Sequence, residues 1–241
     1  MLNFVVGPSR QAVSLHSGIF KYFSVPWARI SENSFDATTD DPVVIEDAVE
    51  NIFAYVCQYL YTGDYCIPLP DDVVPYHIFE EEQYEQSHIL TLNGNIFENS
   101  VSVKKVADYT VRRIQPRPAL PSNGHHYHYF WNYSNALLAH AQLSVFAEQS
   151  ELEELRDISL YKLLNMLHDF PFHTERIGDI IQLVRFVFDS ESGACANLKV
   201  LTLHYMFLHI KPLLHDEEFQ LFLQESPSLN KLVLITLCDF L

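Results

Sequence analysis

The sequence has few of the residues that build phosphate-binding and nucleotide-binding sites. Only 7 glycines occur among 241 residues, and no two of them form a Gly-x-Gly pair. A backbone that wraps closely around a phosphate needs such glycines, so the sequence contains neither a dinucleotide fingerprint nor a phosphate-cradling loop. It also lacks a Gly-x-Ser-x-Gly elbow and a His-Glu-x-x-His helix. These absences predict a protein that is not an enzyme and holds no cofactor.

Cysteines and basic residues are also scarce. Their scarcity bears on the redox compartment of the protein and on its possible partners. Cys57, Cys66, Cys195 and Cys238 form no Cys-x-x-Cys pair, so they indicate neither a zinc ribbon nor a disulfide framework. Separate thiols of this kind are typical of a reducing compartment. The 15 Lys and Arg residues face 31 Asp and Glu residues, and the formal net charge of −16 repels phosphate backbones. We therefore expect no nucleic acid among the partners.

Long apolar runs are missing as well. No run of about eighteen consecutive apolar residues occurs, as a membrane-spanning helix would need. The first residues also lack the pattern of a signal peptide, in which a positively charged segment precedes an apolar one. Yet 48% of the residues are hydrophobic and 13% are aromatic, which is enough to bury a sizeable core. The composition predicts a folded intracellular protein, cytoplasmic or nuclear or both, with no membrane association.

The N-terminal residues predict a small three-stranded sheet. Residues 2–6 (Leu-Asn-Phe-Val-Val) fit a strand, residues 7–9 (Gly-Pro-Ser) a turn, and residues 12–15 (Ala-Val-Ser-Leu) a second strand with alternating apolar positions. A hairpin is the simplest arrangement of these segments. A third strand is expected at residues 43–45 (Val-Val-Ile), after a polar loop.

Two helices are predicted beside this sheet. Ser17 is placed to cap a short helix that Pro26 ends. The second helix follows the third strand, where Asp47 and Glu50 fit a capping box and Gly63 supplies a left-handed stop. Apolar residues at helical spacing predict one buried face on this second helix, formed by Val49, Ile52, Phe53, Val56 and Leu60.

Residues 66–135 differ in composition from both flanks. They contain a run of three glutamates, two basic pairs and a proline-rich segment at 115–121, with little sustained periodicity. A compact domain rarely accommodates so long a connection, so we expect an insertion that is partly disordered. Within it, residues 89–97 fit a small hairpin around Asn93-Gly94.

Beyond the insertion the pattern turns helical. One helix is expected from Leu137 to Ala147. Ser150 and Glu153 fit the capping box of the next helix. Two successive helices with so short a link are expected to pack as an antiparallel pair.

The C-terminal residues predict further helices. Thr174 is expected to cap a helix with one apolar side. Residues 198–214 are apolar nearly all round, which predicts one helix buried among its neighbours, and a last helix is expected from about Ser228. The apolar side of the helix after Thr174 carries Ile177, Ile180, Ile181, Val184 and Val187.

Taken in order, these segments resemble a BTB/POZ domain. The N-terminal part of the resemblance covers residues 2–65, and the part after the insertion covers 136–170. There residues 139–147, with Leu152, Leu155 and Leu160, look like the helix pair that closes this family's core. The resemblance depends on several independent pieces in one order rather than on one short motif. In the N-terminal part it is carried by Phe4 to Gly7, Val13 to Ser17, Phe20, Phe23, Ser24, Ile45 to Asp47, Phe53 and Tyr59 to Tyr65.

The resemblance implies an α+β fold of BTB/POZ type, with a small three-stranded sheet covered by helices, a long insertion and an all-helical C-terminal extension like that of many fungal members. The implied parts are residues 1–65 as the N-terminal portion, 66–135 as the insertion, 136–170 as the closing helices and 171–241 as the extension. The implied function is that of a non-catalytic protein–protein interaction module. Such a domain binds through its surface, either to a second copy as a homodimer or to another protein.

A second interpretation is a substrate adaptor of a cullin-type ubiquitin ligase. Related adaptors use an apolar-x-Glu triplet in the loop before the third strand, and Ile30-Ser31-Glu32 lies at that place. The resemblance therefore implies that Ile30 and Glu32 bind a cullin scaffold. The alternative is an ordinary solvated loop, because this triplet is common by chance.

A third interpretation belongs to a different class of function, a metal-dependent enzyme. His125, His126 and His128 lie near one another in sequence, and imidazoles spaced in this way on a loop can reach one ion. No acidic residue or cysteine stands beside them as a further ligand. Because aromatic residues 129–131 adjoin them, we interpret this segment as an aromatic packing segment and expect no bound metal.

Overall fold

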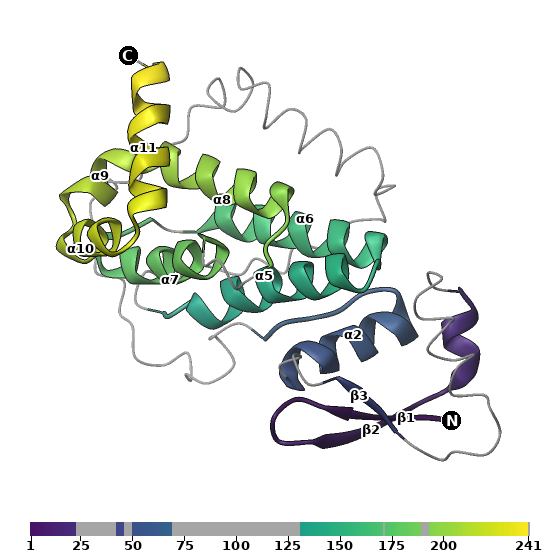
Figure 1. Cartoon of the computed structure of the whole chain (residues 1–241). Helices are drawn as coiled ribbons and strands as arrows, with labels where there is room; N and C mark the ends of the chain where they lie inside the picture. Colours follow the sequence, from purple (N-terminus) through teal and green to yellow (C-terminus); the bar gives the residue numbers. More distant parts are fainter. Residues whose placement is uncertain (23–41, 46–49, 69–130, 171, 189–192, 241) are drawn as a thin grey trace, which may run out of the picture. The chain divides into compact units, whose positions relative to one another are not determined.

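A computed structural model divides the chain into two compact units. The first unit takes its residues from Met1–Ile67 and Ala139–Lys162, and the second takes its residues from Pro68–Leu138 and Leu163–Leu241. The structure describes residues 1–22, 42–45, 50–68, 131–170, 172–188 and 193–240 (Figure 1).

Three predictions lie largely outside the described residues. The insertion at 66–135 is described only at residues 66–68 and 131–135. The hairpin at 89–97 is not described at all, and the capping box before the second helix lacks Asp47. The division of the chain into four parts therefore stays a prediction.

The described structure is α+β and mostly helical, which confirms the predicted fold class at that level. The first unit contains a small sheet, a short 3₁₀ helix and a long helix, and it shares two further helices with the second unit. Its elements are β1 (Leu2–Val6), β2 (Gln11–Leu15), η1 (Ser17–Tyr22), β3 (Val43–Ile45), α2 (Glu50–Thr62), α5 (Ser134–Gln149) and α6 (Glu153–Asp169).

The three strands form a mixed sheet in the order β2-β1-β3. β1 and β2 are antiparallel, with Leu2 opposite Leu15 and Val6 opposite Gln11, so the predicted hairpin is confirmed. Its turn begins at Gly7, whose φ of 67° lies in the left-handed region that glycine adopts without strain. β3 joins the other side of β1 in the parallel direction, which confirms the predicted third strand.

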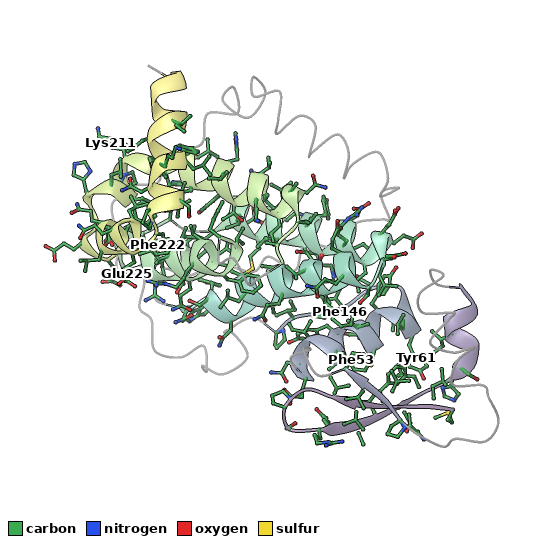
Figure 2. All side chains as sticks on the ribbon, in the orientation of Figure 1. Phe53, Tyr61, Phe146, Lys211, Phe222 and Glu225 are labelled. Carbon is green, nitrogen blue, oxygen red and sulfur yellow. The ribbon has the colours of Figure 1, made fainter. Side chains whose placement is uncertain are left out.

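The inner face of the sheet packs against α2 (Figure 1). Phe4 on β1 and Phe53 on α2 are 0% and 1% exposed, and their ring centroids lie 5.7 Å apart. The Phe53 ring also meets that of Phe146 on α5 edge to face, at 6.3 Å (Figure 2). Each such ring contributes about 1.5–3 kcal/mol by burial. The same core includes residues that follow the insertion in sequence, namely Ala139, Leu143, Ala147, Leu152 and Leu155.

Helix α2 ends as its sequence predicts. Gly63 follows the last helical residue with a φ of 72°, and its N–H donates to the carbonyl of Tyr59 at 2.7 Å. This left-handed residue closes the helix C-terminus without strain because glycine has no Cβ. The predicted stop at Gly63 is therefore confirmed.

The junction of α5 and α6 differs from the predicted capping box. The N–H of Leu152 donates to Ala147 O, and the N–H of Glu151 donates to Glu148 O. These two bonds, with a φ of 56° at Glu151, form a Schellman motif that ends α5. Ser150 therefore belongs to the end of α5, whereas α6 begins at Glu153.

The second unit is helical throughout its described residues. Helix α7 buries all five residues of its predicted apolar side, which confirms that prediction. Beyond the parts of α5 and α6 assigned to it, this unit contains η3 (Thr174–Arg176), α7 (Ile177–Phe188), α8 (Ala196–Leu208), α9 (Ile210–His215), α10 (Glu217–Glu225) and α11 (Pro227–Phe240).

Two details of the second unit correct the sequence analysis. The residue that caps η3 is His173 and not Thr174, since the His173 Nδ1 accepts the N–H of Glu175. The single helix predicted over 198–214 is two helices that meet at His209. Pro212 explains the break, because proline lacks an N–H and its ring collides with the carbonyl four residues earlier in a continuous helix.

Helix α10 was not among the predicted elements, although its sequence carries a start signal. Asp216 caps it by accepting the N–H of Phe219 at 3.0 Å, and two glutamates occupy the first turn. The predicted last helix is confirmed as α11. Within the described residues, no helix has the length and apolar character needed to cross a bilayer.

Candidate functional site

The residues proposed from sequence as binding sites fall outside the described parts of the chain. Ile30 and Glu32 lie in the segment 23–41, and His125, His126 and His128 lie in the segment 69–130. Among the residues that are described, no three His, Cys, Asp or Glu side chains gather closely enough to hold a metal ion. A polar cluster in the first unit, at residues 64 and 65 and on two later helices, is the candidate site that the described residues provide.

Tyr65 and His140 form a buried polar pair in the first unit. The Tyr65 hydroxyl lies 2.7 Å from Nδ1 of His140, and the two residues are 2% and 8% exposed. Tyr65 follows the end of α2, whereas His140 lies on α5, 75 residues later in sequence. The pair therefore fixes the chain leaving α2 against α5. In the tautomer with its proton on Nε2, the neutral imidazole accepts a hydrogen bond from the tyrosine hydroxyl at Nδ1.

Lys162 on α6 completes this cluster. Its Nζ lies 2.6 Å from Oδ1 of Asp64, donates to the carbonyl of Tyr65, and lies 4.2 Å from the centroid of the Tyr65 ring. One ammonium group thus makes an ion pair, a hydrogen bond and a cation–π contact at once. We call Asp64, Tyr65, His140 and Lys162 the α2-exit cluster.

The electrostatics of the α2-exit cluster favour a structural role. Burial, with a smaller effect of the Lys162 charge, lowers the pKa of His140 to about 3. Burial also raises the pKa of the Tyr65 hydroxyl well above its usual value. Both groups are therefore neutral near pH 7, with the proton of the tyrosine engaged by the imidazole. Such a cluster orients three elements but offers no poised base or nucleophile.

A second polar contact fastens the end of β2 to the last turn of α2. The hydroxyl of Tyr61 accepts the backbone N–H of His16 at 3.2 Å and lies 2.7 Å from Nδ1 of the same residue. The two rings meet edge to face at 5.9 Å, while Tyr61 stays 51% exposed (Figure 2). His16, one of the residues Val13 to Ser17 that carry the resemblance, thus holds the end of β2 against α2 and leaves the ring of Tyr61 at the surface.

The outer face of the sheet carries exposed apolar side chains in the first unit. Val5 on β1 pairs with Ala12 on β2 and with Val44 on β3, so the three side chains form one row across the sheet. Ala12 is exposed, Val5 is half-buried and Val44 is 50% exposed. We call these residues the outer row. Because the other face of the same strands is buried in the core, the outer row is the face of the sheet that the described residues leave exposed.

The second unit offers polar groups of another kind. Asp179 is buried, and it accepts the hydroxyl of Ser134 at 2.7 Å and the N–H of Tyr133 at 3.0 Å. These contacts anchor the first turn of α5 on α7 and are structural. The large apolar side chains that the described part of this unit exposes are Leu221, Leu234 and Ile235.

Cys57 of the first unit is not suited to thiol chemistry. Burial raises the pKa of the Cys57 thiol to about 11, which keeps it protonated and weakly nucleophilic. Cys57 lies on α2, and its side chain packs against the core. Its role is therefore to fill space.

Sequence reasoning missed both the α2-exit cluster as a unit and the outer row. The outer row had a readable signal, because alternation along each strand separates a buried set of residues from an exposed set. The Tyr65–His140 pair had none, since no local pattern joins residues that far apart. Comparison with known proteins adds nothing to these assignments, because no family model, curated protein or solved structure matches the chain.

Proposed function

We propose that the chain is a BTB/POZ-like protein–protein interaction module without catalytic activity, which binds a second copy of itself or recruits another protein. The observation that carries the proposal is the outer row, an exposed apolar strip on a sheet whose opposite face is buried. A rigid sheet that exposes apolar side chains beside edge strands is suited to binding another protein.

The placement of the residues behind the resemblance supports this proposal. Phe4, Phe53 and Tyr65 belong to one core with Ala139 and Leu143 from beyond the insertion. The two stretches that resemble the family therefore share a core, as parts of one domain do. The α2-exit cluster, in which Tyr65 and His140 are neutral near pH 7, is consistent with a binding module, because it fixes helices in place instead of presenting reactive groups.

Light scattering on the purified full chain tests the proposal. A mass near twice 27.9 kDa that falls on dilution is the expected result for self-association. A constant mass of one chain from micromolar to near-millimolar concentration would rule self-association out. In that case only the recruitment of a different protein would remain.

The adaptor role is a narrower form of the same proposal. The Ile30-Ser31-Glu32 triplet lies between η1 and β3 in chain order, where related adaptors carry their cullin-binding triplet. Titration with a cullin N-terminal domain tests it, with Ile30→Ala/Glu32→Ala as the variant that should lose binding. Unchanged binding by the variant, or no binding by the natural chain, would argue against the adaptor role.

A further inference from the structure

Strand β2 is an edge strand of the three-stranded sheet. Its inner side pairs with β1 over all five residues, and none of the described segments pairs with its outer side. Every second residue of an edge strand directs its N–H and C=O away from the sheet. Gln11, Ala12 and Ser14 on β2 are exposed, so this edge is reachable from solvent.

The β2 edge lacks the features that usually prevent a sheet from growing. Residues 11–15 (Gln-Ala-Val-Ser-Leu) contain no charged residue and no proline, and their pairing with β1 runs one to one without a bulge. Natural edge strands commonly use a lysine, a proline, a bulge or a covering segment for this purpose. An uncharged and regular edge of this kind favours the addition of another strand.

The charge distribution indicates which strand can be added. The chain carries a net charge of −16, and two copies therefore repel each other over most approaches. Residues 1–22 contain Arg10 and Lys21 but no aspartate or glutamate. The acidic group that the structure places against the hairpin, Glu50, contacts Ser9 in the turn and not the strand. As far as the described residues go, two copies can thus meet at β2 without bringing carboxylates together.

We propose that a second copy of the chain pairs with this one through β2, in antiparallel register about Val13. A two-fold axis at Val13 places Ala12 of each copy opposite Ser14 of the other and Gln11 opposite Leu15, so that all five residues of both strands pair. The two sheets become one sheet of six strands, and their outer rows lie on the same face. This inference rests on the proposed self-association and names its interface.

The experiment is sedimentation equilibrium of the full chain and of two variants that add the same charge. Ala12→Lys/Ser14→Lys places two lysines on exposed positions of β2, where they face two lysines of the second copy. Asn51→Lys/Ala54→Lys places two lysines on exposed positions of α2 and serves as the control. Far-UV circular dichroism and thermal unfolding establish that each variant is folded.

The natural chain and the α2 control are expected to dimerise alike, and the β2 variant to dimerise at least about tenfold more weakly, since like charges lie directly opposite at this interface. Equal dimerisation by all three would overturn the β2 interface while leaving self-association in place. A natural chain that stays monomeric would overturn both.

A cross-linking readout separates a β2 interface from one at the opposite edge of the sheet. Val13→Cys places two thiols across the proposed axis, within the Cα separation that a disulfide spans. Val44→Cys places them on β3. Disulfide dimers above the level of the natural chain for Val13→Cys, and not for Val44→Cys, support the proposal. The reverse pattern contradicts it.

Discussion

Each of the two units buries a histidine, and the two histidines have opposite surroundings. His140 in the first unit is 8% exposed, and its Nδ1 lies 2.7 Å from the Tyr65 hydroxyl. His209 in the second unit is 4% exposed and lies between aromatic rings, stacked on Phe172 at 4.1 Å and tilted against Tyr205 at 4.7 Å. Its Nδ1 and the Tyr205 hydroxyl find no hydrogen-bond partner among the described residues.

The different surroundings of His140 and His209 show how each unit accommodates buried polar groups. In the first unit the buried polar groups are paired across long stretches of sequence, so the chain leaving α2 has one defined position. The second unit also pairs Asp179 with Ser134 and Tyr133, but at His209 aromatic packing outweighs the cost of leaving Nδ1 and the Tyr205 hydroxyl without a described partner, about 1–3 kcal/mol for each such group. A unit that presents a binding surface benefits from the first arrangement, because a surface must have a fixed shape to recognise a partner.

Removal of a core aromatic ring should cause the largest loss of stability in either unit. Phe53→Ala is expected to destabilise the first unit by about 3–5 kcal/mol, and Phe219→Ala to destabilise the second by a similar amount, because both rings are fully buried. Hydrogen exchange resolves the two losses by element. Exchange in Phe53→Ala should rise most in β1 and β2, and an equal rise in α7 and α10 would show that the two units do not respond separately.

Removal of the hydroxyl should reduce stability at Tyr65 but not at Tyr205. Tyr65→Phe leaves Nδ1 of His140 buried without its donor, so we expect a loss of about 1–3 kcal/mol in the free energy of unfolding. Tyr205→Phe removes a hydroxyl that has no described partner, and should cost nothing or stabilise slightly. Urea unfolding of both variants measures the difference. Equal losses of unfolding free energy in the two variants would contradict the proposed difference between a paired and an unpaired hydroxyl.

Acid should destabilise both units through their histidines. Burial lowers the pKa of His140 to about 3 and that of His209 to about 4 in the folded protein, against about 6.5 in the unfolded chain. Below pH 6.5 the unfolded chain therefore binds more protons, and stability falls as the pH is lowered. From pH 7 to 5 the loss is about 2 kcal/mol for each histidine.

The contribution of each histidine to the pH dependence can be measured with substitutions that leave no further buried polar group without a hydrogen-bond partner. His209→Phe keeps the ring stack, and the pair Tyr65→Phe/His140→Phe removes both partners of the hydrogen bond. Each variant should lose less stability between pH 7 and 5 than the natural chain, measured by urea unfolding at both values. A variant whose loss matches that of the natural chain would show that its histidine is not held neutral.

Lys162 should give the smallest effect. Lys162→Met removes the ion pair with Asp64 and the cation–π contact with Tyr65, and both charged side chains are partly exposed. The expected loss is about 0.5–1 kcal/mol. Loss of the nearby positive charge should also raise the pKa of His140, which an NMR titration detects. A lowered pKa would contradict the arrangement of the α2-exit cluster.

The elements that the sequence predicts correctly are those with local signals. The hairpin follows from strand alternation around Gly7, and α2 follows from its apolar stripe and from Gly63. Pro212 signals the break at His209, but the apolar residues on both sides of it have the pattern of one continuous buried helix. The start of α10 was readable from Asp216 in the same way.

The candidate site could be predicted only in part. Alternation along β1 and β2 separates the outer row from the core, yet an exposed row becomes visible only when the strand order is known. The α2-exit cluster depends on contacts between residues 64–65 and residues on two later helices. No periodicity in the sequence records such long-range contacts, so only the fold reveals them.

Hydrogen exchange of the natural chain at two protein concentrations tests the central claim most directly, namely that the chain associates with a second copy through the β2 edge of its sheet. The account predicts that the exchange of β2 amides slows as the concentration is raised, because a second strand covers them, while exchange in α2 stays constant. Exchange of β2 that is independent of concentration, in a sample whose mass shows association, would contradict it.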